Sequence, residues 1–175
     1  IKEILVSGFL SHRMAVGLAT LIALLCGGLL YAASTAADAS HDWPNWRGPE
    51  ATGISDESGW DATWPGRGPG QLWELQVGQG YSSMAVVDGR VYTMGFRDGK
   101  DVVWCIDAAS GDVHWTYEYP GQAARQYPGP RGTPAVRDGK VYTHSRDGKV
   151  HCLSTGKGEK LWMVDLKRKV KAKAG

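Results

Sequence analysis

The feature that most constrains this chain of 175 residues is an internal repeat in its second half. Residues 85–93 read AVVDGRVYT and residues 135–143 read AVRDGKVYT, with seven of nine positions identical at an offset of 50. Further along, Cys105 and Cys152 recur at an offset of 47. Self-similarity at a period of about 20–50 residues is typical of repeat architectures. The sequence therefore predicts two copies of one unit, the second about three residues shorter in or before its RDGK turn.

Each copy divides into short runs of β-branched and aromatic residues separated by turn signals. Asp-Gly between such runs favours a tight hairpin, because both central residues of a type I′ turn need positive φ. The expected strands are 84–87, 90–96, 101–107 and 113–119 in the first copy, and 133–137, 140–145, 149–154 and 160–166 in the second. Four antiparallel strands in under 50 residues, repeated in tandem, predict β-propeller blades. A β-sandwich or an ordinary meander is the alternative.

Residues 71–77 extend the pattern, because Leu72-Trp73 resembles Leu161-Trp162. No three inner strands precede it, so we expect a lone outermost strand of the kind that completes the last blade of a closed propeller. Two blades do not close a ring, since propellers use about four to eight. The fold class is therefore all-β: an incomplete propeller of two four-stranded blades plus one closing outer strand, in a piece of a longer protein.

One tryptophan recurs at the outermost strand of each unit: Trp73, Trp115 and Trp162. We expect each ring to lie flat on the neighbouring blade, against the turn after its third strand. A small residue such as Gly111 or Gly158 permits close approach there. Because a tryptophan buries about 150–250 Å², these residues are interpreted as structural contacts between blades.

The N-terminal residues 1–39 are typical of an export signal, with a helical apolar segment. Residues 15–30 form an apolar run of 16 residues, preceded by His12 and Arg13 and followed by AASTAADAS. A spanning helix needs about 20 residues, so a cleaved signal is favoured over an uncleaved anchor. The sequence thus predicts an exported protein, periplasmic or at the cell surface, that contacts the membrane only through an uncleaved signal.

The charge distribution argues against nucleic acid as a partner. Residues 40–166 hold 13 basic and 16 acidic side chains, although the whole chain has a net charge of +2. Five of the 20 basic residues fall in the last nine positions. We expect residues 40–70 to be an irregular lead-in, 71–166 to be the blades, and 167–175 to be a basic loop that leads to a missing C-terminal part.

Several motifs together resemble the pyrroloquinoline-quinone-like (PQQ-like) β-propeller repeat proteins. This family includes the quinoprotein alcohol dehydrogenases and the non-enzymatic outer-membrane assembly lipoprotein. The resemblance covers residues 42–166. The segments that carry it are the D-G-[RK]-V-Y-T hairpins at 88–93 and 138–143, CLSTGKGEKLW at 152–162, its weaker partner CIDAASGDVHW at 105–115, PRGTP at 130–134 and DWPNWRGP at 42–49.

The resemblance implies the fold and leaves the activity open, because enzymes and scaffolds share the repeat. A dehydrogenase of this family is expected to have a quinone site, oxygen ligands for Ca²⁺ and a catalytic aspartate, often with two adjacent cysteines. The chain has no adjacent cysteines, and Cys105 and Cys152 are interpreted as buried core residues. No catalytic or metal-binding residue is assigned, and PQQ and Ca²⁺ are expected only under the enzyme alternative.

The best binding candidates are residues that enter the innermost strands, because these line the channel mouth of a propeller. They are Tyr81 and Ser83 in the first blade and Arg131 and Thr133 in the second. Tyr127, Trp46 and Arg47 are candidates to cover one face. The ordinary alternative for each is strand capping or packing between blades.

These observations predict an exported binding or scaffold module, non-catalytic in this segment, with a protein or small-ligand partner. One alternative is the N-terminal part of a PQQ-dependent alcohol or sugar dehydrogenase. Another is a ligand- or carbohydrate-recognition domain of a surface protein.

Overall fold

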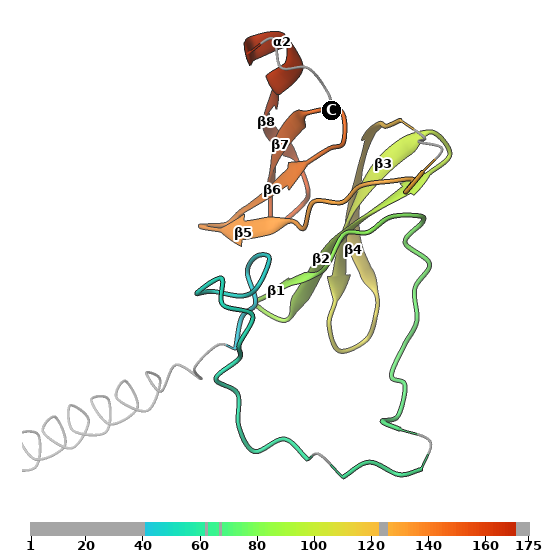
Figure 1. Ribbon diagram of the computed structural model, residues 1–175, viewed down its shortest axis with the longest axis vertical. Helices are drawn as coiled ribbons and strands as arrows, with labels where there is room; N and C mark the ends of the chain where they lie inside the picture. Colours follow the sequence, from blue (N-terminus) through green and yellow to red (C-terminus); the bar gives the residue numbers. More distant parts are fainter. Residues whose placement is uncertain (1–40, 62, 67, 123–125, 171–175) are drawn as a thin grey trace, which may run out of the picture. The chain divides into compact units, whose positions relative to one another are not determined.

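The computed structural model describes residues 41–61, 63–66, 68–122 and 126–170. The predicted signal segment and the last residues of the basic tail lie outside these ranges. Eight strands form two four-stranded antiparallel sheets, in the orders β1-β2-β3-β4 and β5-β6-β7-β8 (Figure 1). The elements are β1 (Ala85–Val87), β2 (Arg90–Arg97), β3 (Lys100–Asp107), β4 (Val113–Pro120), β5 (Ala135–Arg137), β6 (Lys140–His144), β7 (Lys149–Ser154), β8 (Lys160–Asp165) and α2 (Leu166–Val170).

The all-β prediction and the two four-stranded units are confirmed, with every strand end within two residues of its expected position. The segment 166–170 departs from the prediction, because it forms α2, a helix of five residues, where the sequence predicted loop. Among the described helices, none is both long enough and apolar enough to cross a bilayer.

Three of the four Asp-Gly pairs form the expected turns. Asp88, Asp98 and Asp138 have φ of 51°, 52° and 50°, and the glycine after each also has positive φ. This geometry matches a type I′ hairpin, which fits the right-handed twist of the strands.

The fourth pair, Asp147-Gly148, differs from the prediction because only Gly148 has positive φ. Here the Gly148 N–H donates to the carbonyl of Ser145 at 3.0 Å. The Lys149 N–H donates to the Ser145 hydroxyl, also at 3.0 Å. The three-residue difference between the copies falls in this hairpin, so β6 and β7 are connected by a wider turn.

The hydrophobic core has two parts, one on each face of the first sheet. The larger part joins the two sheets and includes Tyr92, Met94 and Trp115 from the first and Val141 and Leu153 from the second. The buried Cys105 and Cys152 have free thiols, as the interpretation as core residues expects. Their backbone register is the same in both sheets, opposite Tyr92 and Tyr142.

The smaller core part covers the other face of the first sheet. Buried Val102 and Trp104 contact Trp73, Leu75 and Val77 there. The exposure of residues 72–77 alternates as in a strand, and the Trp104 indole donates to the Val77 carbonyl at 3.1 Å. Residues 71–77, predicted as a lone outermost strand, pair with neither of the two described sheets. An isolated bridge joins Gln79 to Phe96 instead.

Candidate functional site

Two of the repeated tryptophans lie on glycine turns. The Trp115 indole donates to the Thr155 carbonyl at 2.9 Å, and its ring lies against Gly158 so closely that a side chain there would overlap it. In the same way, the Trp73 indole donates to the Ala108 carbonyl at 3.0 Å. An added Cβ at Gly111 would lie 2.7 Å from the Trp73 ring. Both glycines have positive φ.

The third tryptophan, Trp162, lies in the same register as Trp115, opposite a buried cysteine. Its ring contacts Tyr142, with centroids 6.0 Å apart. It is 43% exposed, whereas Trp115 is 8% exposed. No glycine turn in the described part of the chain covers it.

The lead-in segment lies along the free edges of the two innermost strands. Trp43 exchanges two backbone hydrogen bonds with Val86, at 2.7 and 2.9 Å, and the Val136 N–H donates to the Pro44 carbonyl at 2.8 Å. The Asp42 carboxylate accepts from the Asp88 N–H at 3.1 Å, beside the first hairpin turn. Residues 43 and 44 therefore lie beside the central residues of β1 and β5, and Asp42 lies at the first hairpin turn, away from the strand entries.

At the strand entries, the structure brings Tyr81 and Arg131 together around Tyr127. These three residues line a surface pocket of about 360 Å³. The rings of Tyr81 and Tyr127 meet edge to face, with centroids 5.6 Å apart. The Arg131 guanidinium lies 5.4 Å from the centre of the Tyr127 ring, within cation–π range.

The other two predicted residues, Ser83 and Thr133, line neither this pocket nor the one beside it. The Ser83 carbonyl accepts hydrogen bonds from the hydroxyls of Ser82 and Thr93. Trp46 and Arg47, which were expected to cover one face, are both exposed. The Arg47 side chain donates to the Thr52 carbonyl within the lead-in.

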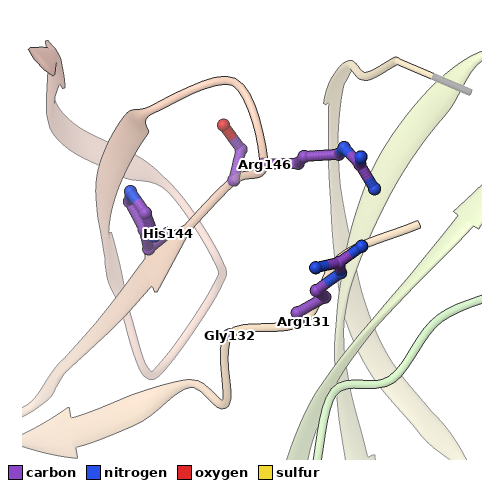
Figure 2. Close-up of a pocket in the computed structure, with 5 residues that line it drawn as sticks. Arg131, Gly132, His144 and Arg146 are labelled. Atoms are coloured by element: carbon purple, nitrogen blue, oxygen red, sulfur yellow. The ribbon is translucent and has the colours of Figure 1, made fainter. Parts of the chain in front are cut away.

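A second pocket, of about 270 Å³, shares Arg131 with the first. Gly132, His144, Ser145 and Arg146 complete it (Figure 2). In Figure 2 the side chains of Arg131 and Arg146 extend toward the same side, and His144 lies across from them on β6. Arg146 is anchored by a hydrogen bond from its Nη1 to the Tyr127 carbonyl at 3.1 Å.

The two pockets are cationic and aromatic, and no carboxylate lines either of them. Of the five ion pairs among the described residues, none includes Arg131 or Arg146. Side chains of this kind donate hydrogen bonds to anionic oxygen, and arginine does so with a planar fork that matches a carboxylate.

Sequence reasoning missed Arg146 and His144 as site residues. One signal was available in the sequence: the offset between the two copies changes around the RDGK motif, in which Arg97 of the first copy corresponds to Arg146 of the second. Arg97 lies within 3.9 Å of the carboxylates of Asp98 and Glu118 and 5.3 Å from the Trp104 ring centre. The shorter hairpin of the second sheet directs Arg146 elsewhere, toward the loop at 126–127.

A buried polar cluster lies between the sheets, near the same end. The rings of Tyr119 and His151 stack with centroids 4.0 Å apart. Tyr119 Oη, Thr143 Oγ1 and His151 Nδ1 are buried without a hydrogen-bond partner. Burial, with the charges of Lys149 and Lys160, lowers the pKa of His151 to about 4. Burial likewise raises the pKa of the nearby Asp101 carboxyl.

The donor set fits an anion better than a metal ion. Within the described ranges, no three His, Cys, Asp or Glu side chains are grouped closely enough to hold a metal. Calcium takes six to eight oxygen ligands, and the two pockets offer guanidinium, imidazole and phenol groups instead. The described residues therefore fit the carboxylates of a quinone such as PQQ but do not fit the Ca²⁺ that the enzyme alternative expects.

The repeated four-stranded sheets and the tryptophan contacts between units define a β-propeller repeat domain. Residues 52–173 match the family described as "Outer membrane protein assembly factor BamB". Because the match covers more than half of the chain, this protein belongs to that family of PQQ-like repeats.

Individual relatives include enzymes. The chain is 35% identical over 89 residues to the quinohemoprotein alcohol dehydrogenase ADH-IIG of Pseudomonas putida, with 47% of this chain and 12% of that enzyme covered. The crystal structure of the quinohemoprotein alcohol dehydrogenase from Comamonas testosteroni has a TM-score of 0.56 and 25% identity, with 76% of this chain and 20% of that chain covered. BamB from Moraxella catarrhalis has a TM-score of 0.41 and 21% identity, with coverages of 53% and 26%. The chain thus spans a fifth or less of either dehydrogenase.

Proposed function

We propose that this chain is a binding or scaffold module of an exported β-propeller protein. Its ligand or partner contacts the strand-entry end, which is the end of the sheets where the chain enters β1 and β5. The contact is made at the two pockets that share Arg131, and Ser83 and Thr133 lie at the margin of these pockets. The observation that carries the proposal is a pair of arginines, Arg131 and Arg146, that form no ion pair with a carboxylate of the described residues. They lie beside the exposed Tyr81 and Tyr127 rings. Exposed aromatic and arginine side chains are enriched at binding interfaces.

The family supports export and a protein partner, because its description names a factor in outer membrane protein assembly. In this proposal residues 1–39 are the export signal and 40–70 the lead-in. Residues 71–166 are the blades, and 167–175 connect to the rest of a longer protein.

The second candidate is the N-terminal part of a quinoprotein dehydrogenase. It is supported by the similarity to two quinohemoprotein alcohol dehydrogenases. In that case Arg131 and Arg146 would hold carboxylates of PQQ and orient the ring system, with Tyr81 and Tyr127 limiting access of water. PQQ, when bound, would supply the electron acceptor for alcohol oxidation.

Two measurements separate these candidates. The chain, in its full-length parent, is incubated with PQQ and Ca²⁺ and then examined for quinone absorbance and dye-linked alcohol oxidation. In the second measurement, a photo-crosslinking amino acid replaces Ser83 in the protein expressed in cells. The same amino acid at Lys157, an exposed position distant from the pockets, is the control. The binding module is expected to give a crosslinked partner from position 83 alone, without alcohol oxidation. Alcohol oxidation that needs Arg131, without a crosslinked partner, would favour the dehydrogenase.

A further inference from the structure

One residue, Tyr127, contacts both arginines of the strand-entry pockets, Arg131 and Arg146. Tyr127 supports Arg131 through its ring and Arg146 through its carbonyl oxygen. Arg146 Nη1 donates that bond and a longer one, at 3.5 Å, to the Gln126 carbonyl, while Nε and Nη2 make no hydrogen bond to the described residues. Side chains fixed in advance lose less conformational entropy on binding than free ones. The two arginines are therefore placed for recognition before any ligand arrives.

The loop that carries Tyr127 is itself fixed. Tyr127 has φ of 55°, a left-handed conformation that a tyrosine rarely adopts. Such backbone persists where the surroundings over-determine it, and it clusters at ligand-binding sites. Two contacts hold the loop here. The Tyr81 N–H donates to the Pro130 carbonyl at 2.8 Å, and Gly129 lies so close to the Gln79 carbonyl that a Cβ would overlap it.

The cationic charge at this site is not paired with a carboxylate in any ion pair of the described residues. In the first copy, Arg97 lies beside two carboxylates and over the Trp104 ring. Arg146 has no such carboxylate and lines a pocket that Arg131 and His144 share. Two guanidinium groups beside one pocket repel each other unless an anion lies between them. The contrast between the two copies indicates that the second arginine serves a ligand.

We propose that the pocket of Arg131, His144 and Arg146 binds a carboxylate of an acidic peptide segment, and that the Tyr81–Tyr127 pocket receives an apolar side chain next to it. This inference rests on the proposed binding function and names its partner's chemistry. A sugar presents hydroxyls that need acceptors as well as donors. The two guanidinium groups that line the polar pocket only donate, and an imidazole such as that of His144 donates from one nitrogen and can accept at the other. The buried Ser145 hydroxyl already accepts a hydrogen bond from the Lys149 N–H, so donors outnumber the available acceptors.

A peptide supplies a carboxylate either from Asp or Glu or from its C-terminus, and the test includes both sources. Three fluorescein-labelled peptides are used with the full chain: Gly-Leu-Phe-Glu-Gly amide, the same peptide with Gln in place of Glu, and Gly-Leu-Gly-Phe with a free C-terminal carboxylate. Binding is measured by fluorescence anisotropy at two salt concentrations. We expect at least one carboxylate peptide to bind about tenfold or more tightly than the Gln peptide, and less tightly at high salt.

The variants Arg146→Ala and Arg131→Ala are each expected to weaken this binding about tenfold or more. Arg137→Ala is the matched control, because this substitution also removes one positive charge from the second copy. The Arg137 side chain is 85% exposed and lies beside Asp138. It is expected to leave the affinity within about twofold. Thermal melts of all three variants should coincide with the unmodified chain, because each side chain lies at the surface.

Equal affinity for the Glu, Gln and free-acid peptides would overturn the proposal, as would loss of binding in Arg137→Ala to the same extent as in Arg146→Ala. PQQ binding that needs both pocket arginines, without any peptide binding, would also overturn it and favour the dehydrogenase. If the crosslinked partner at Ser83 persists while all peptides fail, the binding module stands and this partner chemistry is wrong.

Discussion

At the scale of single residues, glycine decides how closely neighbouring sheets approach. Gly158 combines positive φ with contact to the Trp115 ring, so it avoids two separate costs. A Cβ in the left-handed region costs about 1–2 kcal/mol, and an overpacked contact costs about 1–3 kcal/mol more. We therefore expect Gly158→Ala to lower the free energy of unfolding by about 2–5 kcal/mol, measured by urea denaturation of the full chain.

The same turn provides a control. Gly156 lies two residues earlier, has no neighbouring atom within 4 Å of an added Cβ and does not have positive φ. Gly156→Ala is therefore expected to change stability by less than about 0.5 kcal/mol. Equal losses from the two substitutions would show that turn flexibility, and not the Trp115 contact, sets the cost.

The stacked pair of Tyr119 and His151 predicts a dependence of stability on pH. The pKa of His151 is about 4 in the folded chain and 6.5 for an unperturbed histidine. As the pH falls, His151 is therefore protonated in the unfolded chain before it is protonated in the folded chain. As pH falls from about 6.5 to about 4, the free energy of unfolding is expected to drop by roughly 3 kcal/mol. Asp101, whose pKa is raised, acts in the opposite direction as the pH falls.

His151→Phe keeps an aromatic ring against Tyr119 and removes the titrating group. Urea denaturation at several pH values should show a smaller loss of stability between pH 6.5 and 4 in this variant. His114→Phe, at an exposed position of β4, should retain the loss because His151 is still present. An unchanged pH profile in His151→Phe would assign the dependence to other groups.

The sequence anticipated only part of this residue-level picture. Close approach at Gly111 and Gly158 was predictable, because a glycine and a tryptophan recur together at one offset. The stacking of Tyr119 on His151 was not, because it joins β4 of one copy to β7 of the other. Such contacts depend on the angle between two sheets, which no local pattern in the sequence encodes.

At the scale of elements, the lead-in segment protects strand edges that would otherwise be free. The Val86 and Val136 N–H groups donate to carbonyls of residues 43 and 44. The Trp43 ring lies against Gly48, which has φ of 79°. Gly48→Ala is expected to displace the ring and release the segment. Hydrogen exchange should then accelerate at the Val86 and Val136 amides.

The β2–β3 ladder supplies the reference for this measurement. Its central residues, such as Val103 and Cys105, are buried, and the strands β1 and β2 separate β3 from the lead-in. The amides of these residues should keep their protection in Gly48→Ala. Acceleration of exchange at every amide to the same extent would instead indicate global destabilisation and contradict the edge-protection role.

Strand positions were predictable because Asp-Gly pairs separate consecutive runs of β-branched and aromatic residues. The turn between β6 and β7 was not, although it contains the same Asp-Gly letters. A shortening of three residues leaves no room for a two-residue turn in register, so Ser145 and Lys149 close a wider loop. That loop holds Arg146, which explains why the sequence predicted Arg131 as a binding candidate but not Arg146, although both line the same pocket.

At the scale of the whole molecule, the two sheets are equivalent in register but differ in what covers them. Trp115 and Trp162 pair with equivalent cysteines, yet only Trp115 lies on a glycine turn among the described residues. Truncation of a buried tryptophan costs about 3–5 kcal/mol. Trp115→Ala is therefore expected to cost this amount in urea denaturation. Trp162→Ala should cost less than half as much, because 43% of its surface is already exposed.

The exposed Leu161, Trp162 and Met163 on β8 make this comparison sensitive to association. Exposed apolar surface of this kind favours contact with another blade or a second copy. Sedimentation velocity at several concentrations shows whether the chain is a monomer or associates with a second copy. Losses that are equal at high concentration and diverge on dilution would mean that a second copy covers Trp162. Equal losses at every concentration would contradict the expected difference, because the two tryptophans would then be equally buried within one chain.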